Sequence, residues 1–226
     1  MNGIFLVDKP KGPTSHDIVL ILRRKLQFKK IGHAGTLDPL ASGLLIMLLG
    51  KATKLSSEFL GLDKAYSVRI TLGVRTDTAD AAGKIIREKE VPQYSREAIE
   101  EALLNFKGES WQIPPMVSAK KVNGQKLYRL ARKGISITRQ PHKINITGIK
   151  LTEINLPHLS FELMCSKGTY VRSLTEDIGE YLGCGAHVCE LRRTACGNYN
   201  IKEALKLDEI IRMEQETLVR RFLTLL

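Results

Sequence analysis

The stretch from Gly43 to Leu49 limits what this chain can fold into more than any other. Its residues are apolar without a break from Leu44 to Leu49, which predicts a strand that has to be covered on both faces. This is the longest apolar run in the chain, and it is far too short to cross a membrane. With 226 residues, of which 43% are hydrophobic and 26% charged, the chain is expected to fold as a soluble protein with a sizeable core.

A glycine-rich loop with one carboxylate leads directly into this strand, in the segment from Gly32 to Ile46. Gly32 and Gly35 permit backbone angles that other residues avoid, and Pro39 pushes Asp38 toward an extended conformation. An aspartate held in this way is well placed to act as a reactive group. The same Asp-Pro sequence is typical of a plain surface turn, and the spacing alone does not separate the two interpretations.

The net charge of +11 predicts a polyanionic partner. Nucleic acid is the first candidate, and an anionic membrane surface is the second. The window from Ser110 to Thr152 contains nine Lys or Arg residues and no Asp or Glu, with Trp111 and Tyr128 interleaved. That pattern indicates an RNA-binding face, with a simple solubility patch as the alternative.

The N-terminal residues, Met1 to Pro10, acquire charge too early for a secretory signal peptide, so a cytoplasmic location is expected. The four cysteines should then be reduced thiols. Cys184, His187 and Cys189 lie close enough in sequence to suggest a metal site, but they lack paired ligand spacing. Small buried core residues are the favoured interpretation, and we predict no metal site.

Periodicity predicts strands and helices along most of the chain. The predicted strands are Ile4–Val7, Gly43–Leu49, Lys64–Leu72, one led by Gly83, Leu159–Cys165 and Ala186–Leu191. The predicted helices are one capped by Thr14 or Ser15 and continuing past Leu26, Lys51–Leu60, one capped by Ser95, a short basic one at Lys126–Lys133, Tyr170–Leu182 and Leu207–Leu226. A turn is predicted at Asn123-Gly124.

Three kinds of side chain stand out from this pattern. Tyr66 shares the apolar face of its predicted strand, where a half-buried core tyrosine is the ordinary role. Arg172 lies in the first turn of a helix, where a cation opposes the dipole, which suggests an anionic partner such as a carboxylate. From the spacing alone, an exposed arginine bonded to water is the favoured interpretation. Lys9 and Lys11 lie in a tight loop, where they contact phosphate or form a solvated turn.

Seven motifs occur in one order along nearly the whole chain. They are Lys9-Pro10-Lys11-Gly12-Pro13-Thr14-Ser15, Gly32 to Leu45, Lys64-Ala65-Tyr66, Arg75-Thr76-Asp77-Thr78, Gln112 to Lys120, Gly168-Thr169-Tyr170-Val171-Arg172, and Leu191-Arg192-Arg193. In this the chain resembles the TruB family of tRNA pseudouridine synthases, which isomerise uridine 55 in the T loop.

The resemblance implies a role for each matched position. Asp38 corresponds to the catalytic aspartate, Tyr66 to the tyrosine that stacks on the target uracil, and Arg172 to the arginine that pairs with the aspartate. The resemblance further implies that five residues contact substrate or support the site: His33 where the base leaves the T loop, Tyr170 and Leu191 in the pocket lining, and Lys9 with Pro10 in a motif that supports the active site.

The resemblance also implies an α+β fold with a central mixed, mostly antiparallel sheet, flanking helices and an RNA-binding cleft. We expect residues 1–226 to form a single catalytic domain without the C-terminal PUA domain of longer members, acting as a monomer on the T arm of tRNA. Substrate and product contain the same atoms, so no cofactor is expected. The rival hypothesis is an RNA-binding module or folding chaperone without catalysis, based on the basic charge.

Overall fold

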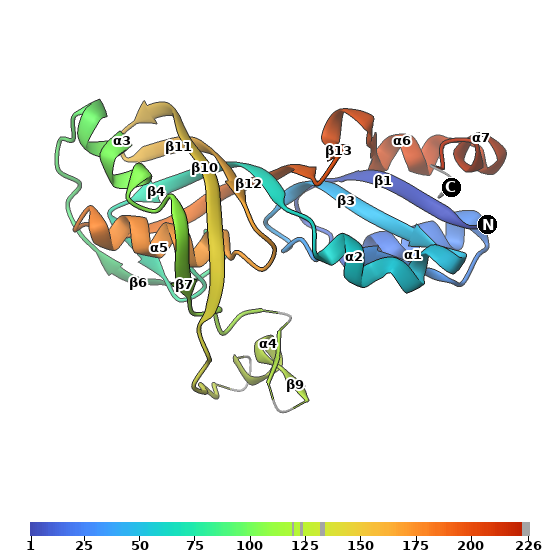
Figure 1. Ribbon diagram of the computed structural model, residues 1–226, viewed down its shortest axis with the longest axis horizontal. Coiled ribbons are helices and arrows are strands. Elements are labelled where there is room, and N and C mark those ends of the chain that lie inside the picture. The colour runs from blue at the N-terminus through green and yellow to red at the C-terminus, as the bar shows by residue number, and fades with distance from the viewer. Residues whose placement is uncertain (119, 123, 132–133, 223–226) are drawn as a thin grey trace. The chain divides into compact units, whose positions relative to one another are not determined.

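The computed structural model (Figure 1) describes residues 1–118, 120–122, 124–131 and 134–222. The chain forms two compact units: unit 1 comprises Met1–Tyr66 and Arg192–Leu226, and unit 2 comprises Ser67–Leu191. The chain passes between units inside strands β4 (Lys64–Leu72) and β12 (Ala186–Cys196). Each of these two strands therefore contributes residues to both units.

In unit 1 the apolar segment forms strand β3 (Ser42–Leu49), in the hydrogen-bonded order β14-β1-β3-β12. Strand β1 (Gly3–Lys9) and strand β2 (Ile31–Ala34) run antiparallel to β3. Two pairings are parallel: β14 (Leu205–Lys206) with β1, and the Arg192-Arg193 part of β12 with β3. Every side chain from Leu44 to Leu49 is at most 1% exposed, so the prediction of a strand covered on both faces is confirmed.

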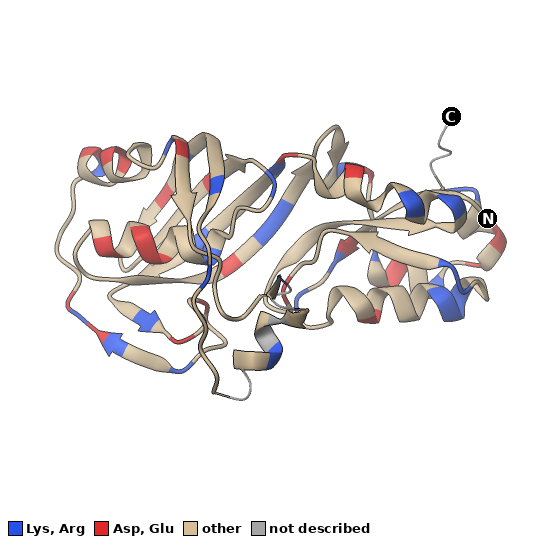
Figure 2. Cartoon of the chain, turned by 60° about the horizontal axis from the view of Figure 1, so that its bottom comes forward, with Lys and Arg blue, Asp and Glu red and all other residues tan. Residues whose placement is uncertain are grey.

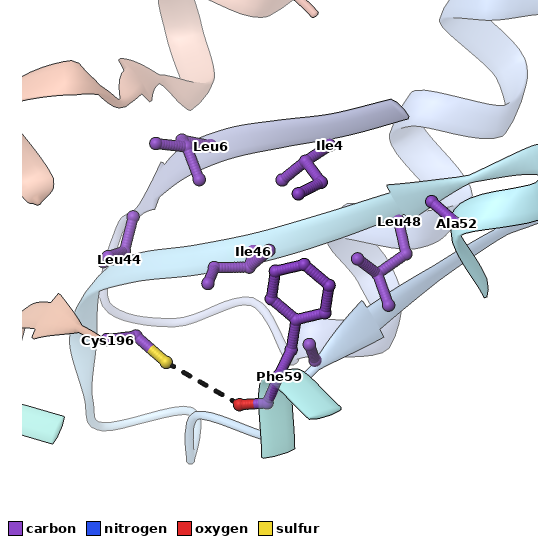
Figure 3. Close-up of a cluster of buried hydrophobic side chains, with 9 residues drawn as sticks. Ile4, Leu6, Leu44, Ile46, Leu48, Ala52, Phe59 and Cys196 are labelled. Carbon is purple, nitrogen blue, oxygen red and sulfur yellow. Dashed lines mark hydrogen bonds between the residues drawn. The ribbon is translucent and has the colours of Figure 1, made fainter. Parts of the chain in front are cut away.

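Apolar side chains pack against both faces of this sheet. On one face, Ile4 and Leu6 of β1 join alternate residues of β3 in a cluster with Phe59 and Cys196, whose thiol donates to the Phe59 carbonyl (Figure 3). Phe5, the intervening residue of β1, packs edge-on against Phe222, with ring centroids 5.3 Å apart. The alternation of β1 thus supplies a core on either side of the sheet.

Helix α1 (Ser15–Leu26) begins as its sequence predicts, because Thr14 is the N-cap and forms a capping box with Asp17. The predicted helix Lys51–Leu60 is a 3-10 turn, η1 (Gly50–Leu55), followed by α2 (Ser56–Leu60). The prediction of one helix over Leu207–Leu226 is wrong.

Two short helices, α6 (Leu207–Arg212) and α7 (Gln215–Val219), replace that single helix, and residues 223–226 lie outside the described part of the chain. Met213 and Glu214 are extended between them, with ψ of 143° and 149°. Each short helix buries its own apolar residue, Ile210 or Leu218, so the apolar spacing needs no continuous helix.

In unit 2 the strand order is β12-β4-β11-β10-β7. Strand β10 (His142–Asn155) is antiparallel to β11 (His158–Cys165) and to β7 (Gly108–Gln112). Neither β7 nor β10 was predicted, and in β10 the cause is visible. Register shifts between Ile146 and Gly148 and between Leu151 and Glu153 interrupt the alternation on which a strand prediction depends.

Two helices and several short elements complete unit 2. Helix α3 (Arg96–Leu104) has the predicted Ser95 cap, and α5 (Val171–Tyr181) has Tyr170 as its N-cap. The short elements are β5 (Val74–Thr76), β6 (Ile85–Glu88), β8 (Lys121–Val122), β9 (Gln125–Lys126) and α4 (Leu127–Ala131). Gly124 of the predicted turn lies between β8 and β9, whereas Asn123, Arg132 and Lys133 lie outside the described residues.

The chain thus has the predicted α+β class, with helices beside a mixed and largely antiparallel sheet. Unit 1 also contains strand β13 (Tyr199–Asn200) and the 3-10 turn η2 (Ile201–Glu203). Lys and Arg residues occur in many elements of the chain (blue in Figure 2). Arg23, Arg24 and Lys25 lie in the last turn of α1. In the described part of the chain, no helix has the length and apolarity needed to cross a membrane.

Candidate active site

Asp38 lies in the segment that joins β2 to β3. The two strands are antiparallel neighbours, and Ala34 near the end of β2 faces Ile46 of β3. The Ala41 N–H donates to the Asp38 carbonyl at 3.0 Å, which closes a turn around Pro39. Leu37 and Ala41 are 3% and 1% exposed, whereas Asp38 is only half-buried. The loop is therefore anchored in the core on both sides of a carboxylate residue that stays accessible.

Two residues near the start of α1 hold this loop from one side. The Ser15 hydroxyl accepts a hydrogen bond from the Leu37 N–H at 2.8 Å, and it donates to the Leu37 carbonyl at 3.0 Å. The Gly12 N–H donates to the Pro39 carbonyl at 2.8 Å. Both backbone neighbours of Asp38 are thus hydrogen-bonded to the segment that precedes α1 or opens it.

Arg193 holds the two ends of the same loop. Its Nε donates to the Leu44 carbonyl at 2.7 Å and its Nη2 to the Gly35 carbonyl at 3.1 Å, while the side chain is 2% exposed. Gly43 lies directly against the backbone of Arg193: a Cβ added there would be 2.3 Å from the Arg193 carbonyl oxygen. Gly43 also has φ of +102°, so glycine is required here for both reasons.

Lys9 ends β1 beside this loop and is fully buried. Its amine donates to the Pro10 carbonyl at 2.8 Å and to the Pro13 carbonyl at 2.9 Å, so the solvated-turn interpretation is wrong for this residue. Burial lowers the pKa of the Lys9 amine from 10.5 to about 8, the charge of Asp38 opposes that shift, and the Arg193 guanidinium adds to it. The electrostatic influence of Asp38 indicates that its carboxylate lies close to a buried cation of its own unit.

Tyr66 and His33 are the other two predicted site residues in unit 1. Tyr66 is half-buried on β4, on the face that continues with the fully buried Val68 and Ile70, as the alternation predicts. The preceding Lys64 donates its amine protons to the Leu60 and Leu62 carbonyls. His33 is half-buried on β2, immediately upstream of the Asp38 loop.

Arg172 lies in the first turn of α5 and is 5% exposed, so the interpretation as a hydrated surface arginine is wrong. Its guanidinium donates to the Thr78 carbonyl at 3.0 Å and to the Val117 carbonyl at 2.6 Å. Its Nη1 also lies 3.6 Å from the Asp80 carboxylate, which is itself 6% exposed. Within unit 2, Asp80 is thus an anionic partner of this cation.

Asp80 was not identified from the sequence; it lies two residues after the motif Arg75-Thr76-Asp77-Thr78. One oxygen of its carboxylate accepts from the Thr78 hydroxyl at 2.7 Å and from the Ala82 N–H at 3.1 Å, while the other faces Arg172. The nearest sequence signal was the cluster of polar residues that follows β5. Asp80 and Arg172 are far apart in the chain, so spacing could not bring them together.

Tyr170 precedes Arg172 and caps α5. The Gln112 side-chain amide accepts from the Tyr170 N–H at 2.8 Å and donates to the Tyr170 carbonyl at 3.1 Å. The ring of His142 lies edge-on to the Tyr170 ring, with centroids 6.0 Å apart, and its Nε2 is 3.0 Å from the Gly168 carbonyl oxygen. Gln112 and His142 thus fix the residue at which α5 begins.

The seven predicted site residues are divided between the units. Lys9, His33, Asp38 and Tyr66 belong to unit 1, whereas Tyr170, Arg172 and the half-buried Leu191 belong to unit 2. The pairing of Arg172 with Asp38 therefore stays a prediction. Next to Leu191 in the chain, Arg192 forms a bidentate ion pair with Asp8, with N–O distances of 2.6 and 3.0 Å.

None of the four cysteines is among the predicted site residues. All four are free thiols, and three of them are buried. The Cys189 thiol donates to the Arg69 carbonyl at 3.2 Å, and His187 Nδ1 lies 3.0 Å from the Val74 carbonyl oxygen. Among the residues that the structure describes, no group of three or more His, Cys, Asp or Glu side chains is arranged to hold a metal ion.

Two solved structures share the fold. The chain matches part of a Cbf5-Nop10-Gar1 complex with 28% identity and a TM-score of 0.72, covering 97% of this chain and 62% of that one. It matches part of an H/ACA RNP bound to a substrate RNA containing 2'-deoxyuridine with 28% identity and a TM-score of 0.69, covering 92% of this chain and 52% of that one. The chain thus spans less than two thirds of the length of either neighbour.

The sequence model of the TruB family pseudouridylate synthase N-terminal domain matches residues 23–171, and that of the tRNA pseudouridylate synthase B C-terminal domain matches residues 172–224. Pseudouridylate synthase is thus the class to which this fold and sequence correspond. A relative named tRNA pseudouridine synthase B, from Opitutus terrae, is 49% identical over 93% of this chain and 87% of its own length. Those of Clostridium tetani and Haemophilus influenzae are 45% and 47% identical, each over 93% of this chain and over 73% and 67% of their own lengths. The chain belongs to the TruB family of pseudouridylate synthases, as the sequence motifs predict.

Proposed function

We propose that this protein isomerises uridine to pseudouridine at position 55 in the T loop of tRNA. The observation that carries the proposal is the Asp38 loop, in which a half-buried aspartate is hydrogen-bonded through its backbone on both sides and lies near the buried amine of Lys9. The similarity to relatives named tRNA pseudouridine synthase B supports the choice of tRNA.

The reaction breaks the N1–C1′ bond of uridine, turns the uracil and forms a C5–C1′ bond. The hydrogen at C5 leaves as a proton and N1 gains one, so substrate and product are isomers and the balance requires no oxidant, reductant or energy source. Positive charge develops at the anomeric carbon as the glycosidic bond breaks, and a carboxylate counters it. Asp38 supplies that carboxylate, and one carboxylate suffices because the base is retained rather than replaced by water.

The remaining site residues serve this step in the proposal. Arg172 pairs with the Asp38 carboxylate and keeps it ionised when solvent is excluded. Tyr66 stacks on the uracil, and Tyr170 and Leu191 line its pocket. A base in a folded T loop has to be flipped out before the half-buried Asp38 carboxylate can reach it, and His33 fills the space that it leaves. Lys9 supports the Asp38 loop.

The T arm of tRNA is the proposed partner, bound in an RNA cleft by a monomer acting in the cytoplasm. The net charge of +11 supports a polyanionic partner such as tRNA. A protein that only binds RNA also accounts for this charge. A protein that only binds RNA would not, however, require an aspartate loop whose backbone is hydrogen-bonded at several points.

The test is the substitution Asp38→Asn, assayed by tritium release from tRNA labelled at C5 of uridine, with Asp208→Asn on the exposed surface of α6 as the matched control. We expect Asp38→Asn to abolish product and to leave tRNA binding largely intact, while Asp208→Asn behaves as wild type. Undiminished product from Asp38→Asn would refute the catalytic role. Salt-sensitive tRNA binding by the wild type without any product would instead support an RNA-binding module.

A further inference from the structure

Two buried polar side chains contact the Asp38 loop through its backbone, and the family resemblance gave neither of them a role. Ser15 is 2% exposed and Arg193 is 2% exposed. Their hydrogen bonds reach three points of the loop: Gly35, Leu37 and Leu44. Both side chains come from segments remote in sequence from the loop.

Ser15 makes an unusual use of a hydroxyl group at the start of a helix. Thr14, not Ser15, caps α1, so the Ser15 hydroxyl is not needed to satisfy the helix N-terminus. It bonds instead to both the N–H and the carbonyl of Leu37, the residue directly before Asp38. This reciprocal pair fixes the peptide units on both sides of Leu37 relative to the rigid start of α1.

Arg193 complements this contact from the sheet. The backbone of Arg193 pairs with Gly43 in the parallel β12–β3 ladder, and its guanidinium bridges the Gly35 and Leu44 carbonyls. A planar guanidinium donates along fixed directions, so this bridge sets the distance between the two ends of the loop. Burying a guanidinium costs free energy unless its N–H groups are hydrogen-bonded, and the Gly35 and Leu44 carbonyls accept hydrogen bonds from Arg193.

We propose that Ser15 and Arg193 are positioning residues that hold Asp38 in its reactive place through the backbone of its loop. The proposal rests on the proposed function of Asp38. Displacing a reacting group by about 1 Å costs up to about 100-fold in rate, so a loop released at Leu37 or at its ends should slow the chemical step. Binding of tRNA depends on a far larger surface and should change little.

The experiment compares Ser15→Ala with Ser95→Ala. Ser95 caps α3 in unit 2 through a bond from the Ala98 N–H at 3.1 Å, so its loss also removes a serine–backbone bond but leaves the Asp38 loop intact. Single-turnover tritium release at saturating protein gives the rate of the chemical step, and filter binding gives the Kd for tRNA. We expect Ser15→Ala to be about 10- to 100-fold slower with its Kd within about twofold of wild type, and Ser95→Ala to keep the wild-type rate.

Arg193→Lys provides an independent measurement, because it keeps the positive charge but loses the two-point bridge. It should also slow the single-turnover rate while leaving the Kd for tRNA little changed. A wild-type rate in Ser15→Ala, or an equal loss of rate in Ser15→Ala and Ser95→Ala, would overturn the positioning role. Asp38→Asn distinguishes a failure of the positioning role from a failure of the proposed function. If Asp38→Asn is inactive while Ser15→Ala is unimpaired, only the positioning role is wrong. If Asp38→Asn is active, the proposed function is wrong.

Discussion

The buried amine of Lys9 makes the stability of the protein depend on pH in a way that one substitution isolates. Its pKa is about 8 in the folded protein, against an ordinary value of 10.5. Between these two values the unfolded chain binds the proton more strongly than the folded chain does. The free energy of unfolding therefore rises as the pH increases through this interval, by about 3 kcal/mol in all.

The hydrogen bonds of Lys9 favour this interpretation. A neutral amine still has two N–H groups, and the Lys9 amine has two backbone carbonyl acceptors, those of Pro10 and Pro13. Deprotonation therefore removes the desolvation penalty of the charge and leaves both hydrogen bonds in place. Below about pH 8 both states are protonated, so the full penalty is present and stability no longer changes on account of Lys9.

The perturbation is Lys9→Met, which keeps an unbranched chain but cannot titrate. Unfolding in urea, followed by circular dichroism under reducing conditions, gives the free energy of unfolding of both proteins at several pH values. Other lysines, tyrosines and cysteines titrate in both proteins and cancel in the difference. Between about pH 7 and pH 11, we expect the free energy of unfolding of the wild type to rise by about 3 kcal/mol relative to that of Lys9→Met. A difference that is constant across this interval, or that falls with pH, would refute a buried amine with a lowered pKa.

Two further substitutions test contacts in each unit. Asp80→Asn removes the carboxylate that lies 3.6 Å from Arg172, so single-turnover pseudouridine formation should slow by about 10-fold or more; a wild-type rate would show that this ion pair is dispensable. Gly43→Ala places a Cβ 2.3 Å from a backbone oxygen of β12 at φ of +102°, which should lower the free energy of unfolding by at least about 2 kcal/mol in urea. A decrease in the free energy of unfolding of less than about 1 kcal/mol would mean that β3 and β12 can move apart to accommodate the Cβ without strain.

Local patterns in the sequence predicted those parts of the fold that depend on a few neighbouring residues. The apolar run of β3, the alternation of β4 and the caps of α1 and α3 each follow from chemistry within one element. The same holds for the Asp38 loop, whose glycines permit backbone angles that other residues avoid and whose proline restricts the backbone. The seven family motifs added the class of protein and the site residues, which composition alone could not supply.

What the sequence did not predict depends on contacts between distant segments. Strand β10 is built from residues whose alternation is interrupted by two register shifts, so its pairing with β7 and β11 defines it better than its composition does. Asp80 becomes a partner of Arg172 only when the loop after β5 meets the start of α5. The helix break at Met213 was also not predicted, because the two short helices bury separate apolar residues, Ile210 and Leu218.

The motif around Lys9 shows why residue type alone misleads. A lysine in a proline- and glycine-rich loop is expected to contact solvent or phosphate, and Ser15 was one of two candidates for the helix cap, yet both side chains are buried and bond to backbone carbonyls. Lys9 brings a cation close to Asp38, and Ser15 fixes the residue directly before it. The segment between β1 and α1 therefore supports the aspartate loop electrostatically and mechanically at once. A loop that carries a reactive carboxylate has to be rigid, and hydrogen bonds to its main-chain groups provide that rigidity.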